Sequence, residues 1–565
     1  MDTALTTNHN VAQLLIESAR HCPDRPAVVS QVRQKSGRWI YQSGSFQELA
    51  RQATAVAAAL AARRVPPGAR LVLMVRPGWD FVTLVFALLG GGYVPVLVDP
   101  GLGWKRIVRC LAKLQPDGLA GIPLAHWAFV FSPHRVRFRY RISVGRGWIR
   151  GWSLSELTSH SPTDGFRPVS PDTPAALIFT SGSTGPPKAV LYFHQHFAAQ
   201  IRLLREAYDI QPGQVDLATF PLFGLFNGAL GVTTVFPRMN FTRPARVRPE
   251  HILAACQDWK VTHAFGSPAL WTQVVRYCEH TGRKLSGVQR LFSAGAAVPV
   301  KLLERLRAVT DPETQIHTPY GATEALPIAS IEARQLLDLR SSCLPPNGGY
   351  CVGKPLPGIE IAVIRIDDGP LPHRSDVQPV APGEVGELVV SGPVVTEQYA
   401  ADPQANLLHK IQDGQRTWHR MGDVGYLDSE GRIWYCGRKA HRVQTPCGTL
   451  FTEPCESVFL KHPAVYRAAL VGVGRPPEQL PVMVVQPWPE HWPKSRRTRR
   501  SLEQELQRLA AAHPLTCSIQ HILLKKSLPV DIRHNAKIFR EKLVPWVTRR
   551  LRRNGLRLQF TLPGS

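Results

Sequence analysis

Cysteine is scarce in this chain, and its scarcity excludes two classes of protein. The 565 residues include ten cysteines, and no two of them form a CxxC pair. A small disulfide-stapled domain and a CxxC zinc or redox module are therefore both excluded, and we expect reduced thiols. The N-terminal residues also lack a basic stretch followed by an apolar one. We therefore expect no secretory signal and a cytoplasmic protein.

Long hydrophobic runs are also scarce. Residues 81–98 carry no charge, and this run is only as long as the shortest bilayer span. Gly90, Gly91 and Gly92 interrupt it. This pattern predicts a helix over residues 79–89, a glycine turn and a strand over residues 93–98. We therefore expect no transmembrane segment.

Acidic residues are too few to balance the basic ones. The chain has 42 Asp and Glu residues and 68 Lys and Arg residues, which gives a net charge of +26. Residues 441–565 alone hold 21 basic and 8 acidic residues, with arginine clusters at 496–500 and 549–553. Attraction to an anionic partner and a solvated basic surface both explain this excess. Neither an aromatic-interleaved RNA motif nor a zinc-finger spacing accompanies it, so we expect no specific nucleic-acid partner.

A second basic feature lies earlier in the chain. Arg135, Arg137, Arg139 and Arg141 alternate with Val, Phe, Tyr and Ile. Alternation with period two predicts a strand that has one basic face. Two interpretations stay open, an edge strand whose charges prevent unwanted pairing and an anion-binding face.

Helix patterns alternate with short β-branched runs through the first 440 residues, which predicts an α/β fold of layered, mainly parallel sheets. Pro and Gly recur among β-rich stretches at residues 348–392, which favours a subdomain of antiparallel strands. A fresh β-α alternation after residue 440 predicts a smaller α+β domain. The clearest expected helices are 46–62 and 300–309, and the clearest expected strands are 71–75, 177–180, 261–265 and 288–293.

One loop carries the strongest chemical signal. It leaves an apolar strand at residues 175–179 and combines hydroxyl side chains, glycines and a terminal cation. Hydroxyls, close backbone approach and a positive charge are what a polyphosphate requires. The loop is not a Walker A motif, because Pro187 precedes Lys188 and Ala189 follows it. Its predicted phosphate-binding residues are Thr180, Ser181, Gly182, Ser183, Thr184, Gly185 and Lys188.

Further motifs follow in a fixed order, and together they resemble the adenylate-forming superfamily of acyl-CoA synthetases, firefly luciferase and peptide-synthetase adenylation domains. The loop matches that family's TSGSTGxPKG except for Ala189 at the last position. The resemblance runs from about residue 12 to 543. Its other motifs are Ser293-Ala294-Gly295-Ala296, Tyr320-Gly321-Ala322-Thr323-Glu324, Gly386-Glu387, Gly422-Asp423 and Gly437-Arg438.

The resemblance implies the cofactors ATP and Mg²⁺ and a role for each motif. Ala294, Gly295 and Ala296 would line the adenine, and Tyr320, followed by Gly321 and Ala322, would stack on it. Thr323 would contact the α-phosphate, and Glu324 would bind Mg²⁺. Asp423 and Arg438 would hold the ribose hydroxyls. Because a carboxylate must attack a phosphate, cations near the reacting atoms lower an electrostatic barrier.

The resemblance also implies the domain organisation. Lys537 stands where the family carries a catalytic lysine on a small mobile domain, although Ala536 replaces the usual preceding glycine. A long, flexible ammonium group can bridge the carboxylate and the α-phosphate. We expect a large adenylation domain at residues 1–437, which includes the β-subdomain, a hinge at 438–440 and a mobile domain at 441–565.

Two positions depart from the family pattern. The usual hinge residue, Asp or Lys, is Ala440, and the histidine of the common PLFH run is Gly224. The first departure puts the domain rotation in doubt. Around the second, residues 224–226 and 228–232 are typical of an apolar pocket wall.

Several runs resemble the β-lactone synthetases of bacterial long-chain olefin biosynthesis, namely residues 219–223, 265–270, 316–327 and 529–537. The resemblance implies adenylation of a long-chain β-hydroxy acid, followed by displacement of AMP by the acid's own hydroxyl. The alternatives are a fatty-acyl-CoA ligase and an inactive scaffold subunit. His194 and His196 are candidates for the base that takes the hydroxyl proton. The alternative interpretation is that both are ordinary histidines at the start of a helix. A complex with other pathway enzymes and a peripheral membrane contact are compatible with this assignment.

Overall fold

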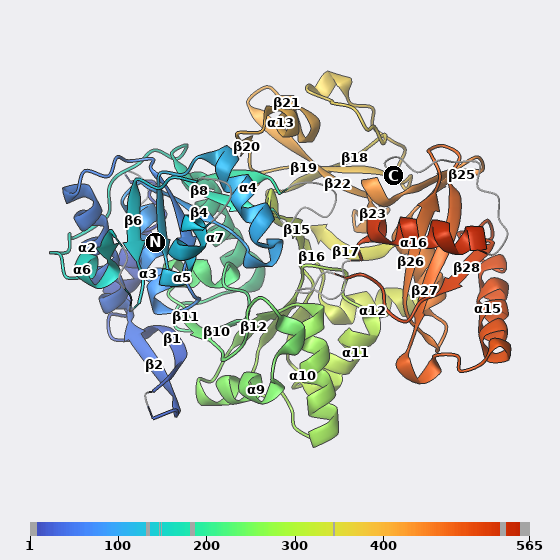
Figure 1. Ribbon diagram of the computed structural model, residues 1–565, viewed down its shortest axis with the longest axis horizontal. Helices are drawn as coiled ribbons and strands as arrows, with labels where there is room; N and C mark the ends of the chain where they lie inside the picture. Colours follow the sequence, from blue (N-terminus) through green and yellow to red (C-terminus); the bar gives the residue numbers. More distant parts are fainter. Residues whose placement is uncertain are drawn as a thin grey trace.

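The computed structural model describes residues 8–34, 36–131, 136–145, 147, 150–180, 187–342, 345–530 and 538–553. The predicted loop residues Ser181, Gly182, Ser183, Thr184 and Gly185, and the predicted catalytic Lys537, lie outside these ranges. Within them, three large sheets and their helices are followed by a smaller C-terminal unit (Figure 1). The predicted α/β class is confirmed.

The first sheet is parallel except at one edge, where β2 runs antiparallel to β1. Its described strand order is β14 (Gln315–His317), β13 (Arg290–Ser293), β12 (His263–Gly266), β10 (Val215–Ala218), β11 (Thr233–Phe236), β1 (Pro26–Arg33) and β2 (Trp39–Ser45). The associated helices are α9 (Pro249–Asp258), α10 (Pro268–Thr281), α11 (Val300–Val309) and α12 (Ala333–Ser342).

The second sheet has a parallel centre that leads into the phosphate loop. Strands β9 and β20 join one edge in antiparallel fashion. The described order is β20 (Gln398–Ala400), β9 (Ala189–Phe193), β8 (Pro174–Phe179), β4 (Val94–Leu97), β3 (Arg70–Met74), β5 (Gly118–Gly121), β6 (Tyr140–Ser143) and β7 (Trp152–Ser153). Its chain segments also form α4 (Trp104–Leu114), α5 (Pro123–Val130) and α6 (Leu154–Thr158).

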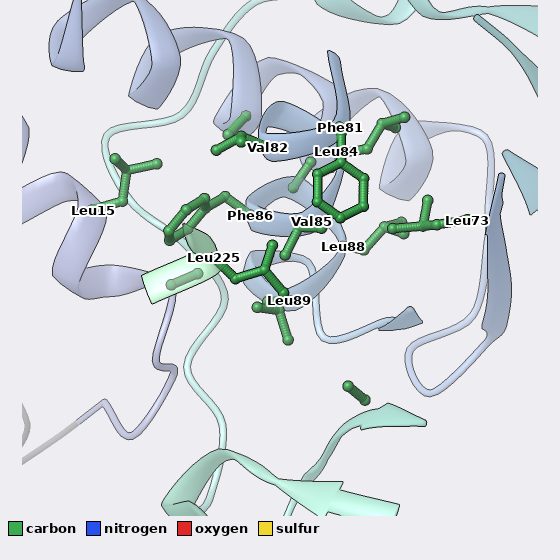
Figure 2. Packing of buried hydrophobic residues seen from close by; sticks show 14 of the residues in the cluster. Leu15, Leu73, Phe81, Val82, Leu84, Val85, Phe86, Leu88, Leu89 and Leu225 are labelled. Atoms are coloured by element: carbon green, nitrogen blue, oxygen red, sulfur yellow. The ribbon is translucent and has the colours of Figure 1, made fainter. Parts of the chain in front are cut away.

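Helices between these sheets bury the largest hydrophobic cluster. It joins Val28 of the first sheet to Leu71 of the second through α3 (Trp79–Gly90), an apolar helix whose Phe86 and Leu89 face Leu225 (Figure 2). The predicted helix, glycine turn and strand at residues 79–98 are therefore confirmed as α3 and β4. The other helices of this layer are α1 (Gln13–His21), α2 (Phe46–Ala62), α7 (His194–Tyr208) and α8 (Asn227–Leu230).

The third sheet is antiparallel, as the Pro- and Gly-rich pattern predicted. Four of the predicted motifs lie on or between its strands, at residues 320–324, 386–387, 422–423 and 437–438. Its described order is β15 (Tyr320–Ala322), β16 (Ala325–Ser330), β17 (Tyr350–Pro355), β23 (Ile433–Arg438), β22 (Arg416–Leu427), β19 (Gly386–Ser391) and β18 (Glu360–Ile364), with β21 (Lys410–Asp413) paired to β22 and α13 (Pro403–His409) nearby.

The C-terminal unit has a three-stranded sheet with helices on both faces. Strand residues alternate between two clusters, so that Leu470 packs with α14 and α15 while Val471 packs with α16. This period of two is what a sheet covered on both faces requires. The elements are β24 (Val443–Thr445), β25 (Gly448–Leu450), α14 (Thr452–Leu460), β26 (Val465–Val473), β27 (Leu480–Pro487), α15 (Arg496–Ala511), β28 (His521–Leu524) and α16 (Arg540–Arg553).

The arginine-alternating segment differs from its prediction. Strand β6 begins only at Tyr140, so that Arg137 and Arg139 precede it, and β7 rather than β6 occupies the edge of the sheet. The edge-strand interpretation is therefore wrong. Strand β6 pairs with β5 along one side and, at Ile142 and Ser143, with β7 on the other. Among the described residues, every helix is too short or too polar to cross a bilayer.

A buried carboxyl in the first sheet predicts a pH-dependent stability. Burial raises the pKa of Asp216 to about 7, although the Asn227 amide donates a hydrogen bond to it at 2.8 Å. His263 lies 3.9 Å away, but burial lowers its pKa to about 3, so the pair is not an ion pair at neutral pH. The folded-state pKa is above the unfolded value of about 3.9, so this group makes stability fall as pH rises from about 4 through about 7.

The Asp216→Asn variant should lack that part of the pH dependence. Relative to the wild type, we expect its free energy of unfolding to rise by roughly 2–3 kcal/mol between about pH 5 and about pH 8. Urea unfolding at the two pH values measures both differences. An equal difference at the two pH values would show that Asp216 does not titrate in this range.

Candidate functional site

The two ends of the phosphate loop are fixed to each other. Thr180 N donates to Lys188 O at 2.9 Å, and Lys188 N donates to the Thr180 hydroxyl at 3.2 Å. Antiparallel pairing of β8 with β9 continues from this point, with Phe179 opposite Ala189. The loop therefore leaves and re-enters the sheet at one place, and its terminal cation has a defined position.

Lys188 belongs to a cluster of polar side chains, of which only Lys188 and Glu324 are part of the sequence motifs. Its Nζ lies 2.6 Å from His409 Nε2 and 5.2 Å from the centre of the Tyr399 ring. The Tyr399 hydroxyl donates to Glu324 Oε1 at 2.8 Å. Burial lowers the pKa of Lys188, while the Glu324 carboxylate opposes this shift. The cluster thus combines a cation and a carboxylate beside the loop that is predicted to hold phosphates.

Tyr399 and His409 reach this cluster from a distant part of the sequence. Strand β20 pairs with β9 and places Tyr399 opposite Val190, and α13 ends at His409. Burial and nearby cations lower the pKa of His409 to about 3, so its neutral ring accepts from Lys188. A ring with so low a pKa orients the lysine but is a weak general base.

A second cluster joins the remaining polar motifs. Asp423 and Arg438 are paired residues of β22 and β23, and their Oδ1 and Nη1 atoms lie 3.0 Å apart. The Tyr320 hydroxyl donates to Asp423 Oδ2 at 2.6 Å. A Cβ on Gly321 would lie 2.8 Å from Ala325 O, which explains glycine in this tight hairpin. Since Tyr320 and Glu324 bracket one short turn, the two clusters are adjacent.

The predicted adenine-lining residues lie at the same sheet edge as Tyr320. Ala294, Gly295 and Ala296 follow β13, which pairs in parallel with β14, the strand that leads to Tyr320. The carboxyl ends of neighbouring parallel strands lie at the same end of a sheet, so the segments that follow β13 and β14 meet there. The Thr323 carbonyl accepts from the hydroxyl of Tyr192, a residue of β9, the strand that follows the loop. Among the described residues, no three His, Cys, Asp or Glu side chains form a metal cluster.

Asp423 offers a direct test of the predicted ribose site. Asp423→Ala should weaken ATP binding by roughly 10- to 100-fold, because a charged hydrogen-bond acceptor contributes about 1.5–3 kcal/mol. Titration calorimetry with ATP measures the loss, and Glu430→Ala, which removes an exposed carboxylate from the turn after β22, is the matched control. An unchanged dissociation constant in a folded Asp423 variant would rule out the ribose assignment.

An apolar cavity lies behind the phosphate-binding sheet. Leu225, Phe226 and Ala229 line it, as the apolar run predicted, and face Phe86 and Phe197. Its volume of about 20 Å³ holds little more than one water molecule. A Cβ on Gly224 would lie 2.9 Å from Ala218 Cβ, so the packing here leaves no room for the histidine found in the common PLFH run.

His194 and His196 lie at the wrong end of β9 to act near the loop. Lys188 precedes β9 and His194 follows it, which separates them by about 20 Å at about 3.3 Å per residue. His194 Nδ1 accepts from Val11 N at 3.1 Å, and His196 Nδ1 accepts from Phe193 N at 3.0 Å. Both are helix-start histidines, and this position argues against either as the base for lactone closure.

The segment predicted as a hinge, residues 438–440, is held by Lys439 within it and by Arg442 just after it. Lys439 Nζ lies 3.0 Å from Glu387, which is fully buried and also binds Arg420 at 2.6 Å. Arg442 pairs with Asp368 at 2.5 Å. Ala440 itself is exposed. In this conformation, Lys439 and Arg442 fasten the start of the C-terminal unit to the third sheet.

Comparison with known proteins defines the class. A family model described as AMP-binding enzyme matches residues 15–400. The chain therefore belongs to the AMP-binding enzyme family, and the adenylate-forming resemblance is confirmed. It is 43% identical over 555 residues to the olefin beta-lactone synthetase of Xanthomonas campestris pv. campestris, with 96% of this chain and 98% of the relative covered. It is 42% identical to the olefin beta-lactone synthetase of Stenotrophomonas maltophilia, again with 96% and 98% covered.

A solved structure supports the fold independently. The amide bond synthetase McbA from Marinactinospora thermotolerans superimposes with a TM-score of 0.76 at 22% identity. The match covers 96% of this chain and 99% of McbA. This likeness extends the shared fold beyond residue 400 into the C-terminal unit.

Proposed function

We propose that this enzyme converts ATP and a long-chain β-hydroxy fatty acid into a β-lactone, AMP and pyrophosphate. The observation that carries the proposal is the 43% and 42% identity, over nearly the whole chain, to two proteins named olefin beta-lactone synthetase. The described clusters supply the charges that adenylation requires. A fatty-acyl-CoA ligase, the alternative, would share the adenylation step but not this identity.

In the first step, a carboxylate oxygen of the acid attacks the α-phosphorus of ATP, and the bond to pyrophosphate breaks. Lys188 would bind the phosphates beside the loop, and His409 would hold its ammonium group in place. Asp423 and Arg438 would bind the ribose, and Tyr320 would stack on adenine between Ala294–Ala296 and its own strand. Lys537 would approach from the C-terminal unit to stabilise the charge that develops.

Glu324 suits a magnesium ion that arrives with the nucleotide. Among the described residues, Tyr399 is the side chain that hydrogen-bonds its carboxylate, and only through Oε1. Mg²⁺ in nucleotide sites takes one or two carboxylates together with phosphate oxygens and water, so a single Glu fits this mode. The ion would neutralise phosphate charge during attack. Thr323, next to Glu324, would contact the α-phosphate.

The apolar cavity is the proposed site for the acyl chain. It is too small in this conformation for a long chain, so Phe197 or Phe226 must move aside when the acid binds. The two rings are tilted relative to each other, and their centroids lie 5.4 Å apart between α7 and α8. A rotamer change of either side chain would open space here without breaking a strand. A cavity wall with few polar groups selects for the acyl chain of the substrate rather than for its polar end.

In the second step, the β-hydroxyl oxygen of the bound acyl adenylate attacks the acyl carbon. The bond from that carbon to the AMP oxygen breaks, AMP leaves, and the hydroxyl proton passes to AMP or solvent. An intramolecular nucleophile needs no thiol, because its effective concentration exceeds that of any free acceptor. The small-molecule partners would be ATP and the hydrophobic acid. We also propose the cytoplasm as the compartment and other olefin-pathway enzymes as partners.

Product analysis tests the proposal. Purified enzyme with ATP, Mg²⁺ and a β-hydroxy fatty acid should form the same product with or without coenzyme A. Infrared spectroscopy distinguishes the carbonyl of a strained four-membered lactone from that of a thioester. A thioester that forms only with coenzyme A would establish the acyl-CoA ligase instead.

A further inference from the structure

Helix α5 exposes an apolar surface that the proposed reaction does not use. Leu124, Trp127, Val130 and Phe131, here called the α5 patch, are 73%, 48%, 55% and 78% exposed. Leu124, Trp127 and Phe131 follow the spacing of one helical face. The Trp127 and Phe131 rings stack, with centroids 6.0 Å apart and planes at 19°. This side of α5 therefore presents two large aromatic rings to the surroundings.

The opposite side of α5 is firmly packed. Phe129 is buried, and its ring lies 4.8 Å from Trp104 of α4 and 4.9 Å from Phe138. His126 is also buried, and its Nε2 lies 3.1 Å from Ile142 O. Because the buried side already anchors the helix, folding does not explain the apolar residues on the exposed side.

The α5 patch is unusual within this molecule. The other exposed large hydrophobic residues of the described ranges, Trp39, Leu407 and Leu460, come singly from separate elements. Single exposed apolar residues are ordinary on protein surfaces, whereas a contiguous group marks an interaction site. Helix α5 also contains no charged residue, so nothing in it keeps the exposed side in water.

The chain on both sides of α5 is strongly basic. Residues 101–152 contain ten Lys and Arg but a single acidic residue, Asp117, which accepts from Arg70 N at 2.8 Å. Trp104 and Phe138, the two rings that contact Phe129, belong to the flanking segments, so these segments lie against α5. Their exposed cations include Lys105, Arg106, Arg109 and Lys113 on α4, and Arg137 and Arg139 before β6.

We propose that the α5 patch and its flanking cations dock this protein onto an anionic lipid surface. The aromatic rings and Leu124 would enter the boundary between head groups and acyl chains, and the cations would bind lipid phosphates. A tryptophan beside exposed apolar residues is the typical occupant of that boundary. Arg137 and Arg139 would then belong to an anion-binding surface, the interpretation that the sequence left open.

The position of α5 fits this role. Strand β5, which precedes α5, runs parallel to β3, β4 and β8 in one sheet. The carboxyl ends of parallel strands share an edge. Helix α5 therefore begins at the edge where β8 delivers Thr180 and the phosphate loop. The inference does not depend on the proposed reaction, because lipid binding is measured without turnover.

Vesicle sedimentation tests the proposal with the full-length protein. Vesicles of equal parts phosphatidylcholine and phosphatidylglycerol should sediment the wild type, and pure phosphatidylcholine vesicles should bind it much more weakly. The Trp127→Ser/Phe131→Ser variant should bind the anionic vesicles at least about tenfold more weakly, because two rings no longer leave water. Lys105→Gln/Arg109→Gln should lose about fivefold for each charge removed.

Matched controls separate this surface from the rest of the basic chain. Trp39→Ser removes an exposed ring elsewhere and should bind like the wild type. Arg496→Gln/Arg500→Gln removes two exposed charges from α15, whose apolar residues Leu502 and Leu506 are buried, and should lose less than the α4 pair. The variants concern exposed side chains, and unchanged circular dichroism confirms their fold.

Three results would overturn the proposal. The first is a wild type that does not sediment with anionic vesicles. The second is a Trp127→Ser/Phe131→Ser variant that binds as tightly as the wild type. The third is a change of oligomeric state in that variant, measured by light scattering, which would make the α5 patch a contact between copies of this chain.

Discussion

Lys537→Ala should lower the rate of acyl-adenylate formation by roughly 10²- to 10³-fold, with ATP affinity little changed. Loss of one charged donor aimed at a transition state has an effect of this size. The reason is that the lysine would meet the α-phosphate only when the C-terminal unit closes over the bound nucleotide. Pyrophosphate release in single-turnover reactions measures the rate, and calorimetry measures the affinity.

Lys542→Ala is the matched control for that experiment. Lys542 is exposed on α16, a few residues after the predicted lysine, and its Nζ lies over the Phe539 ring. We expect its variant to release pyrophosphate like the wild type. A normal rate in the Lys537 variant would show that the catalytic cation lies elsewhere in the C-terminal unit.

Glu324→Gln should also reduce adenylation by about 10²- to 10³-fold. The amide keeps the shape of the side chain and can still accept from Tyr399, but it no longer offers a negative oxygen to the metal. Higher magnesium concentrations should restore part of the rate. Glu313→Gln, which neutralises an exposed carboxylate outside the site, is the control. A Glu324 variant with normal activity and normal magnesium dependence would remove this residue from the proposed site.

Much of the fold could be predicted because its elements carry strong local patterns. The helices at residues 46–62 and 300–309 match α2 and α11, since apolar residues recur on one face of each, and Ser45 caps the start of α2. Which strand lies at the edge beside the arginine alternation could not be predicted. Which strand occupies an edge depends on β7, a two-residue element that leaves no periodic pattern.

The ordered motifs are the part of the sequence from which the proximity of site residues could be expected. The structure brings Thr180 and Lys188 together, and it pairs Asp423 with Arg438. The register between the two strands that carry Asp423 and Arg438 could not be read from any local pattern. Tyr399 and His409 were missed, because single aromatic residues outside a motif resemble ordinary core residues. Only the pairing of β20 with β9, two strands far apart in the sequence, reveals that Tyr399 contacts Glu324.

The central claim is that the nucleophile of the second step belongs to the substrate. The most direct measurement compares two acids of equal chain length, with and without the β-hydroxyl, by following pyrophosphate release in the absence of coenzyme A. The hydroxy acid should turn over repeatedly and yield lactone. The plain acid should release about one equivalent of pyrophosphate per enzyme and stop as bound acyl adenylate, because it lacks the tethered nucleophile. Repeated turnover of the plain acid that requires coenzyme A would contradict the account.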